Sequence, residues 1–308
     1  MIQRRTLLAG IAAGTATSVT SAHAQTPSEI VLAVVPAENA SGVSDRFAPF
    51  VAYLSKQIGV KVTLRIANDY AAVIEGQRAG NVHIGYYGPA SFSRARLTNV
   101  ATDAFVIDVN SDGTKGYYSV FYVRASSPFK TLADLKGKNL GLVDPNSTSG
   151  YNMPLFALNK NGIPAADKYF ANVQITGSHE NAVIALAQGT VDMCANWWNA
   201  DDDSNLTRML SKGMVKDNTG KTLKKEDFRI ILKSDLIINS PTAYLTALPT
   251  DLKAKIKQAY LDAATKDKAA FDKLSDGKNQ PWQTVDNAAY DDTIKLIRFV
   301  DGLRKKAA

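Results

Sequence analysis

The sequence alternates, over most of its length, between short apolar runs and longer segments whose apolar residues recur at helical spacing. Residues 30–35 form a continuous apolar run of the kind found in strands buried on both faces, and residues 46–57 follow with apolar side chains on one helical face. The same order recurs over residues 60–78 and again over residues 82–97. This alternation predicts an α/β fold, built on a mostly parallel sheet with helices on both of its faces.

The alternation starts again near residue 117. Further strand-like and helical segments follow, and three helical patterns close the chain between residues 250 and 305. We therefore expect two α/β lobes, the second inserted into the first, with connections near 117–124 and 233–242. In this division residues 25–120 and 238–308 form lobe 1, and residues 121–237 form lobe 2.

The N-terminus has the features of an export signal. Arg4 and Arg5 precede a short stretch of small and apolar residues, which ends in the A-x-A pattern at Ala24. The paired arginines favour the twin-arginine route, and the general secretory route remains an alternative. Because no later segment has about 18 uninterrupted apolar residues, we expect residues 1–24 to be removed and the exported protein to have no stable membrane insertion.

Composition argues against several classes of function. The chain has 308 residues, a single cysteine (Cys194) and three histidines, so we expect neither a disulfide framework nor a metal cluster. The formal net charge of +7 falls to +5 without residues 1–24, which hold two arginines and no acid, and this mild excess does not indicate a nucleic-acid partner. The sequence contains no P-loop, no G-x-G-x-x-G and no G-x-S-x-G, and we expect no cofactor.

Candidate binding residues lie where predicted strands meet predicted helices. In α/β sheets these junctions lie at the carboxyl ends of the strands, where ligands bind. The junction 144–150 has three consecutive hydroxyl residues, Ser147, Thr148 and Ser149, beside a glycine and a helix start. Hydroxyls and free backbone N–H groups at a helix N-terminus suit a phosphate-like oxyanion. A Ser/Thr cap of the helix would account for one of the three hydroxyls.

Three other junctions supply polar and aromatic side chains. His179 is placed in the first turn of a helix, where the helix dipole favours a neutral imidazole that can donate one hydrogen bond; packing against a neighbour is the alternative. Tyr70 and Tyr87 follow two strands of lobe 1 and could equally be half-buried aromatics of the rim. Trp198 and Asn199 follow a strand of lobe 2 and suit the wall of a small pocket.

Two nearby features have simpler interpretations. Asp201, Asp202 and Asp203 lack the alternating spacing and the glycine of a calcium loop, so we expect a solvated turn. Cys194 lies in an apolar run and is expected to be a buried small hydrophobe.

The junction motifs resemble those of the PhnD-type substrate-binding proteins of ABC importers. The resemblance runs in order from about residue 30 to residue 264, and the run Asp-Pro-Asn-Ser-Thr-Ser-Gly at 144–150 is its most specific part. It implies a two-lobed periplasmic binding protein fold of type II, with the ligand cleft between the lobes. It also implies a periplasmic location, an ABC transporter permease as partner, and a phosphonate, phosphite or related phosphorus oxyanion as ligand. By the family pattern, six residues hold the oxyanion: Tyr70 and Tyr87 from lobe 1, and Ser147, Thr148, Ser149 and His179 from lobe 2.

One departure from the family pattern concerns the ligand tail. Members that bind 2-aminoethylphosphonate have two acids that pair with its ammonium, and Asn199 and Ser240 stand at the matching positions here. Because an unpaired ammonium in a closed cleft is costly, these replacements favour a ligand without an amine.

Two other functions remain as alternatives. A phosphoester hydrolase would use Ser147 or Ser149 as nucleophile, His179 as base and Asp192 as the orienting acid. Three hydroxyls in a row do not single out a nucleophile, however, and metal ligands are lacking, so we expect binding without catalysis. A ligand sensor that feeds a membrane receptor would have the same sequence features.

Overall fold

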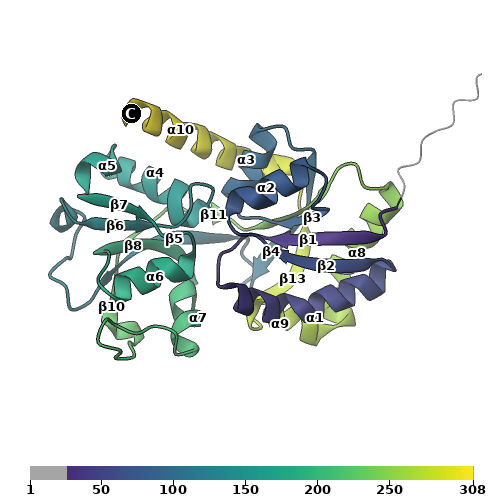
Figure 1. Cartoon of the computed structure of the whole chain (residues 1–308), viewed down its shortest axis with the longest axis horizontal. Coiled ribbons are helices and arrows are strands. Elements are labelled where there is room, and N and C mark those ends of the chain that lie inside the picture. Colours follow the sequence, from purple (N-terminus) through teal and green to yellow (C-terminus); the bar gives the residue numbers. More distant parts are fainter. Residues whose placement is uncertain (1–25, 308) are drawn as a thin grey trace, which may run out of the picture.

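The structure, a computed structural model, describes residues 26–307 and shows two α/β lobes side by side (Figure 1). The expected two-lobed α/β fold is therefore confirmed. The predicted export signal, residues 1–24, lies outside the described residues. Within the described part of the chain, no helix has both the length and the apolar character that a membrane span requires.

The first lobe is a six-stranded sheet in the order β13-β4-β12-β3-β1-β2. Helices α2 and α3 cover one face of this sheet, and α1, α8 and α9 cover the other (Figure 1). The elements of this lobe are β1 (Glu29–Val34), α1 (Ala40–Ile58), β2 (Lys61–Ile66), α2 (Tyr70–Arg78), β3 (Ile84–Tyr86), α3 (Pro89–Leu97), β4 (Thr102–Asn110), β12 (Pro241–Leu245), α8 (Thr250–Lys266), α9 (Lys268–Ser275) and β13 (Asn279–Thr284).

The second lobe is built around strands in the order β10-β5-β8-β6-β7, with α4 and α5 on one face and α6 and α7 on the other (Figure 1). Two short strands lie off this order: β11 pairs with β5, and β9 pairs with β8. Its elements are β5 (Gly116–Arg124), β6 (Asn139–Leu142), α4 (Met153–Lys160), α5 (Ala166–Tyr169), β7 (Asn172–Ile175), α6 (His179–Ala187), β8 (Met193–Ala200), β9 (Asp203–Ser204), α7 (Asn205–Ser211), β10 (Phe228–Lys233) and β11 (Ile237–Ile238). A π-helical turn, η2 (Thr148–Asn152), precedes α4 directly.

The sheets are less parallel than the sequence predicts. In the first lobe β1 pairs in parallel with β2 and β3, as its continuous apolar run indicates, but β12, β4 and β13 join antiparallel. Sequence analysis did not identify β4 or β13. Strand β4 runs directly into the turn before β5, and the chain returns to pair β12 beside β4, so these pairings depend on long-range contacts that local periodicity does not report.

The chain passes from the first sheet to the second between Asn110 and Gly116, and returns between Ile238 and Pro241. Strand β5 therefore begins in the second sheet, before residue 120, where the predicted division ends the first segment of lobe 1. The C-terminal helix α10 (Asp291–Ala307) packs against α3 of the first lobe and α4 of the second. Figure 1 shows it crossing from one lobe to the other. The division at residues 120 and 238 stays a prediction.

Aromatic packing holds α1 and α8 onto the first sheet. The Phe50 ring lies 4.9 Å from the Tyr260 ring and 5.2 Å from the Trp282 ring, between centroids, and Phe50 is fully buried. Burial of one such phenylalanine stabilises the fold by about 1.5–3 kcal/mol. Substitution of Phe50 by alanine would leave a cavity and cost about 3–5 kcal/mol.

Candidate functional site

A cavity of about 160 Å³ lies between the two lobes, at the edge where strands lead into helices. Its lining comes from both sheets and from the loops that connect them. Six of the eight predicted site residues line it: Tyr70, Ser147, Thr148, Ser149, His179 and Asn199.

Four helical N-termini meet at the inner part of this cavity. Tyr70 is the first residue of α2, Gly88 caps α3, Thr148 begins η2 and His179 begins α6. All four residues line the cavity. Because the N-terminal end of a helix carries a partial positive charge and free N–H donors, this arrangement favours an anion.

The hydroxyl row combines capping with access to the cavity. Ser147 caps the helical turn, since its Oγ accepts the Gly150 N–H at 3.1 Å. The Thr148 Oγ1 accepts the Ala90 N–H from the other lobe at 2.8 Å. Ser149 is almost fully buried, and its carbonyl oxygen accepts the Ser119 hydroxyl at 2.6 Å. Of the three hydroxyls, only that of Ser147 caps its own helical turn, and Ser147 lines the cavity as well.

His179 is neutral in this environment. The side chain is 3% exposed, and burial lowers the pKa of its imidazole to about 4. Its Nε2 lies 3.4 Å from the Ser147 Oγ, and its buried Nδ1 has no partner among the described residues. The lowered pKa agrees with the neutral form expected from the sequence, and its main physical cause is burial rather than the helix dipole.

Two predicted site residues lie outside the cavity, and in both cases the neighbouring residue takes the predicted place. Tyr87 is fully buried in the first lobe, where its hydroxyl donates to Gln77 Oε1 at 2.8 Å. Its ring folds back over Gly85, which has no Cβ to obstruct it. Tyr86 lines the cavity instead. Successive side chains of a strand point to opposite faces, so a shift of one residue exchanges the faces.

Trp198 also lies outside the cavity, and its neighbour Trp197 lines it instead. Trp198 packs against the Tyr118 ring at 5.9 Å between centroids, with the Lys233 ammonium 4.1 Å from its own centroid. Trp197 and Asn199, two residues apart on β8, both line the cavity. The sequence predicts Trp198 on the pocket wall, whereas the structure places Trp197 there.

Charged residues that sequence analysis did not single out line the outer part of the cavity. The Arg46 guanidinium pairs with Glu38 at 2.9 Å and also donates to the Leu274 carbonyl. Arg208, from α7, pairs with Asp203 at 3.2 Å and lies over the Trp197 ring, 4.8 Å from its centroid. No local motif marks these residues, because α1 and α7 bring the two arginines to the cleft through tertiary packing.

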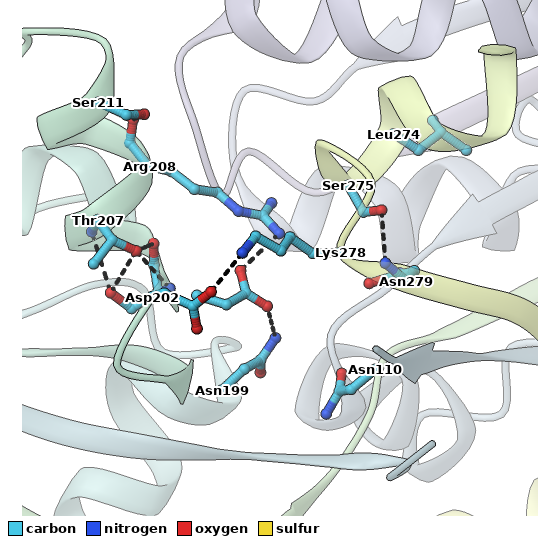
Figure 2. Close-up of polar contacts among 12 residues, drawn as sticks. Asn110, Asn199, Asp202, Thr207, Arg208, Ser211, Leu274, Ser275, Lys278 and Asn279 are labelled. Carbon is cyan, nitrogen blue, oxygen red and sulfur yellow. Dashed lines mark hydrogen bonds and ion pairs between the residues drawn. The ribbon is translucent and has the colours of Figure 1, made fainter. Parts of the chain in front are cut away.

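Asp203 corrects the expectation of a solvated acidic turn. It is 6% exposed, accepts the Asn199 Nδ2–H at 2.8 Å and pairs with Arg208. Asp201 and Asp202 are exposed, and Asp202 pairs with Lys278 of the first lobe at 2.6 Å. Figure 2 shows Arg208 and Asp202 facing the turn from Ser275 to Asn279, from which Lys278 reaches Asp202.

Asp108 lines the cavity, as does a second acid, Glu38. The Asp108 carboxylate accepts the Tyr86 hydroxyl at 2.7 Å and the Trp282 Nε1–H at 2.8 Å, and it has no ion-pair partner within the described chain. Burial raises the pKa of this carboxyl. The Asp108 N–H donates to the Ser240 carbonyl at 3.3 Å, so this acid lies next to one of the positions where an acid was judged missing.

Two smaller findings concern metals and the cysteine. Within residues 26–307, no group of three or more His, Cys, Asp or Glu side chains is arranged to hold a metal ion. Cys194 is fully buried, as expected, and burial raises the pKa of its thiol.

Comparison with known proteins gives a consistent result. Residues 32–290 match a family model described as "ABC transporter, phosphonate, periplasmic substrate-binding protein". The chain is 30% identical over 266 residues to the phosphonates-binding periplasmic protein of Escherichia coli K12, covering 84% of this chain and 74% of that protein. It is 32% identical over 245 residues to the phosphate-import protein PhnD of Mycolicibacterium smegmatis, covering 77% and 73%.

Solved structures show the same fold. The structure of PhnD1 from Prochlorococcus marinus in complex with methylphosphonate superposes with a TM-score of 0.73 at 21% identity, covering 90% of this chain and 99% of that one. The binding-protein component of an ABC phosphonate transporter from Pseudomonas aeruginosa superposes with a TM-score of 0.72 at 24% identity, covering 89% and 85%.

Proposed function

The chain belongs to the family of periplasmic substrate-binding proteins of phosphonate ABC transporters, and on this premise we propose that its interlobe cavity binds a small phosphorus oxyanion. The head group would lie at the inner end of the cavity, against the hydroxyl row and His179. The relatives support this ligand class, since the E. coli protein is named for phosphonates, the M. smegmatis protein for phosphate, and the P. marinus structure contains methylphosphonate.

The observation that carries the proposal is the convergence of four helical N-termini on one side of the cavity, with three hydroxyl residues among them. A tetrahedral oxyanion has several acceptor atoms that point in different directions, and donors from two lobes can surround it. Backbone N–H groups and hydroxyls are uncharged, so the anion is held by fixed dipoles rather than by a single counter-ion.

Three features favour binding over hydrolysis. The Ser147 Oγ is engaged by the Gly150 N–H and lies 3.4 Å from the His179 Nε2, a long contact for a nucleophile and its base. The His179 Nδ1 has no acidic partner in the described region. Asp192, which a hydrolase would use to orient the histidine, accepts the Asn139 N–H at 2.8 Å, at the opposite end of β6 from the cavity. The proposed role is binding without chemical conversion.

The proposal extends to the transport partner. In this role residues 1–24 are removed near Ala24, the mature protein works in the periplasm, and the two lobes close on the ligand and present it to a membrane permease of an ABC importer. Uptake of radiolabelled ligand by cells with and without this protein, the permease being present in both, separates this role from sensing, because a sensor would not be required for uptake.

Isothermal titration calorimetry of the mature protein tests the proposal directly. Methylphosphonate, phosphite and phosphate are titrated in parallel, with sulfate as the tetrahedral anion that lacks phosphorus. We expect one-to-one binding of at least one phosphorus oxyanion and weaker binding of sulfate. The absence of binding by all three, or a preference for sulfate, would overturn the proposal.

A further inference from the structure

We propose that the outer part of the cavity selects ligands whose short tail carries hydroxyl groups, namely a hydroxylated alkylphosphonate or a polyol phosphate monoester. This inference rests on the proposed function, because it assumes that the phosphorus head group occupies the inner end. It adds the chemical class of the tail, which neither the family nor the named relatives specify.

The size of the cavity leaves room for a tail. A water occupies about 30 Å³ in the liquid, so a cavity of about 160 Å³ takes the equivalent of about five waters. A head group held by the hydroxyl row and His179 does not reach the whole lining, which extends to Ser275 and Asn279. The outer region must then hold either several waters or further atoms of the ligand.

The outer wall is rich in uncharged groups that both donate and accept hydrogen bonds. A side-chain amide offers an acceptor oxygen and two donor hydrogens, and a hydroxyl does both as well. A ligand hydroxyl matches such a wall better than an ammonium, which only donates, or a carboxylate, which only accepts. The residues of this kind that line the cavity are Asn110, Asn199, Asn239, Asn279, Ser240 and Ser275. The Asn110 amide and the Asn239 N–H groups already bond within the protein, so the amide groups available to a ligand are chiefly those of Asn199 and Asn279.

The charges of the outer wall are largely paired within the protein. Arg46 is neutralised by Glu38 and Arg208 by Asp203, so neither arginine is an unpaired partner for a carboxylate tail. Asp108 has no ion pair in the described part of the chain, and burial raises its pKa, a rise that the nearby charges of Arg208 and Arg46 partly oppose. The same two positive charges would oppose an ammonium group placed beside Asp108.

Asp108 and Arg208 reach the cavity from different lobes, and they make no direct ion pair. The Asp108 carboxylate accepts two hydrogen bonds and has capacity for more, while the Arg208 Nε–H has no acceptor among the described residues. A hydroxyl placed between them can donate to the acid and accept from the arginine. A hydroxylated tail would thereby join the two lobes without adding charge.

Calorimetry with matched ligand pairs tests this inference on the wild-type protein. We compare 2,3-dihydroxypropylphosphonate with propylphosphonate, and glycerol 3-phosphate with propyl phosphate, and we include methylphosphonate, 2-aminoethylphosphonate and phosphonoacetate. Since a hydrogen bond to a charged partner is worth about 1.5–3 kcal/mol, we expect at least one hydroxylated ligand to bind 10-fold or more tightly than its propyl counterpart. The tighter binder of the two hydroxylated ligands, 2,3-dihydroxypropylphosphonate or glycerol 3-phosphate, shows whether the site prefers a phosphonate or a phosphate ester.

Three results would overturn the inference: propyl ligands that bind as tightly as hydroxylated ones, a preference for 2-aminoethylphosphonate, or a preference for phosphonoacetate. Each of these leaves the proposed function intact, because a phosphorus oxyanion still binds. If no compound of the series binds, methylphosphonate included, the proposed function itself fails.

Two variants locate the selectivity. Asn279→Ala removes a first-lobe amide that makes no side-chain hydrogen bond within the described chain. Asn199→Ala removes a second-lobe amide, which donates to Asp203. Each is expected to lower the affinity ratio of the hydroxylated to the propyl ligand by about 3- to 10-fold. Asn172→Ala, at an exposed position on β7, is the matched control and should leave the ratio unchanged. An unchanged ratio in both site variants, with thermal unfolding like that of the wild type, would contradict the inference.

Discussion

The Thr148 Oγ1 accepts a hydrogen bond from the Ala90 N–H at 2.8 Å, so a hydroxyl of the second lobe caps the first turn of α3 in the first lobe. Pro89 begins this helix and has no N–H, which makes the Ala90 N–H one of the first free donors of the helix. The same hydroxyl lines the cavity. One side chain therefore takes part both in the contact between the lobes and in the wall of the cavity.

Thr148→Val should weaken binding of the phosphorus oxyanion without unfolding the protein. The valine keeps the shape of threonine but loses the hydroxyl that faces both the ligand and Ala90. A hydrogen bond to a charged ligand is worth about 1.5–3 kcal/mol, so we expect the dissociation constant to rise by roughly 10- to 150-fold in calorimetry. Thr265→Val, at an exposed position on α8, is the control. Wild-type affinity in Thr148→Val would count against the hydroxyl row as the anion site.

The two adjacent tyrosines should respond differently to loss of their hydroxyls. Tyr87→Phe leaves the buried Gln77 Oε1 without its donor and should lower the free energy of unfolding by about 1–3 kcal/mol, with ligand affinity retained. Tyr86→Phe removes the donor to Asp108 on the cavity wall and should change affinity as well. Urea unfolding and calorimetry on both variants measure these effects. A selective loss of affinity in Tyr87→Phe would restore the assignment made from the sequence.

His179 should contribute to the loss of stability in acid. A base whose folded pKa is lowered stabilises the fold above its ordinary pKa and loses that contribution as the pH falls toward the folded value. With a folded pKa of about 4 against an ordinary value of about 6.5, the protein should lose about 2–3 kcal/mol through this residue between pH 7 and about pH 4.5.

The comparison with His179→Gln isolates this effect from the titration of carboxylates. Urea unfolding of both proteins at the two pH values gives the loss for each. The variant should lose less stability than the wild type, whatever its absolute stability at pH 7. Equal losses would show that His179 does not remain neutral in the folded protein.

Gly150→Ala should disturb the hydroxyl row through the backbone. A Cβ at this position would overlap the Val143 side chain and lie 2.8 Å from the Ser147 Oγ, so η2 would have to shift. We expect a destabilisation of about 1–3 kcal/mol together with weaker ligand binding. Gly302→Ala in α10 has open space around its Cβ and should stabilise the protein by about 0.5–1 kcal/mol. Retention of wild-type affinity in Gly150→Ala would mean that η2 tolerates the shift.

Local sequence patterns predicted much of the inner site. The hydroxyl row was recognised because three hydroxyl residues beside a glycine at a helix start exceed what capping needs, and Ser147 is indeed the cap. The position of His179 followed from the pattern of α6, which begins at that residue. Each of these features lies within one strand-to-helix junction, where residues close in sequence are close in space.

The outer site depends on relationships that local patterns do not contain. Whether Tyr86 or Tyr87 faces the cavity depends on the rotation of a strand, because a shift of one residue exchanges its two faces. The meeting of Arg46, Asp108 and Arg208 depends on how α1, β4 and α7 pack, since these elements are far apart in the chain. The sequence by itself determined the α/β alternation and the polar strand-to-helix junctions, through backbone propensity and helix capping. Only the packing of the two lobes decided which side chains complete the cavity, because contacts between distant segments form when both sheets are assembled.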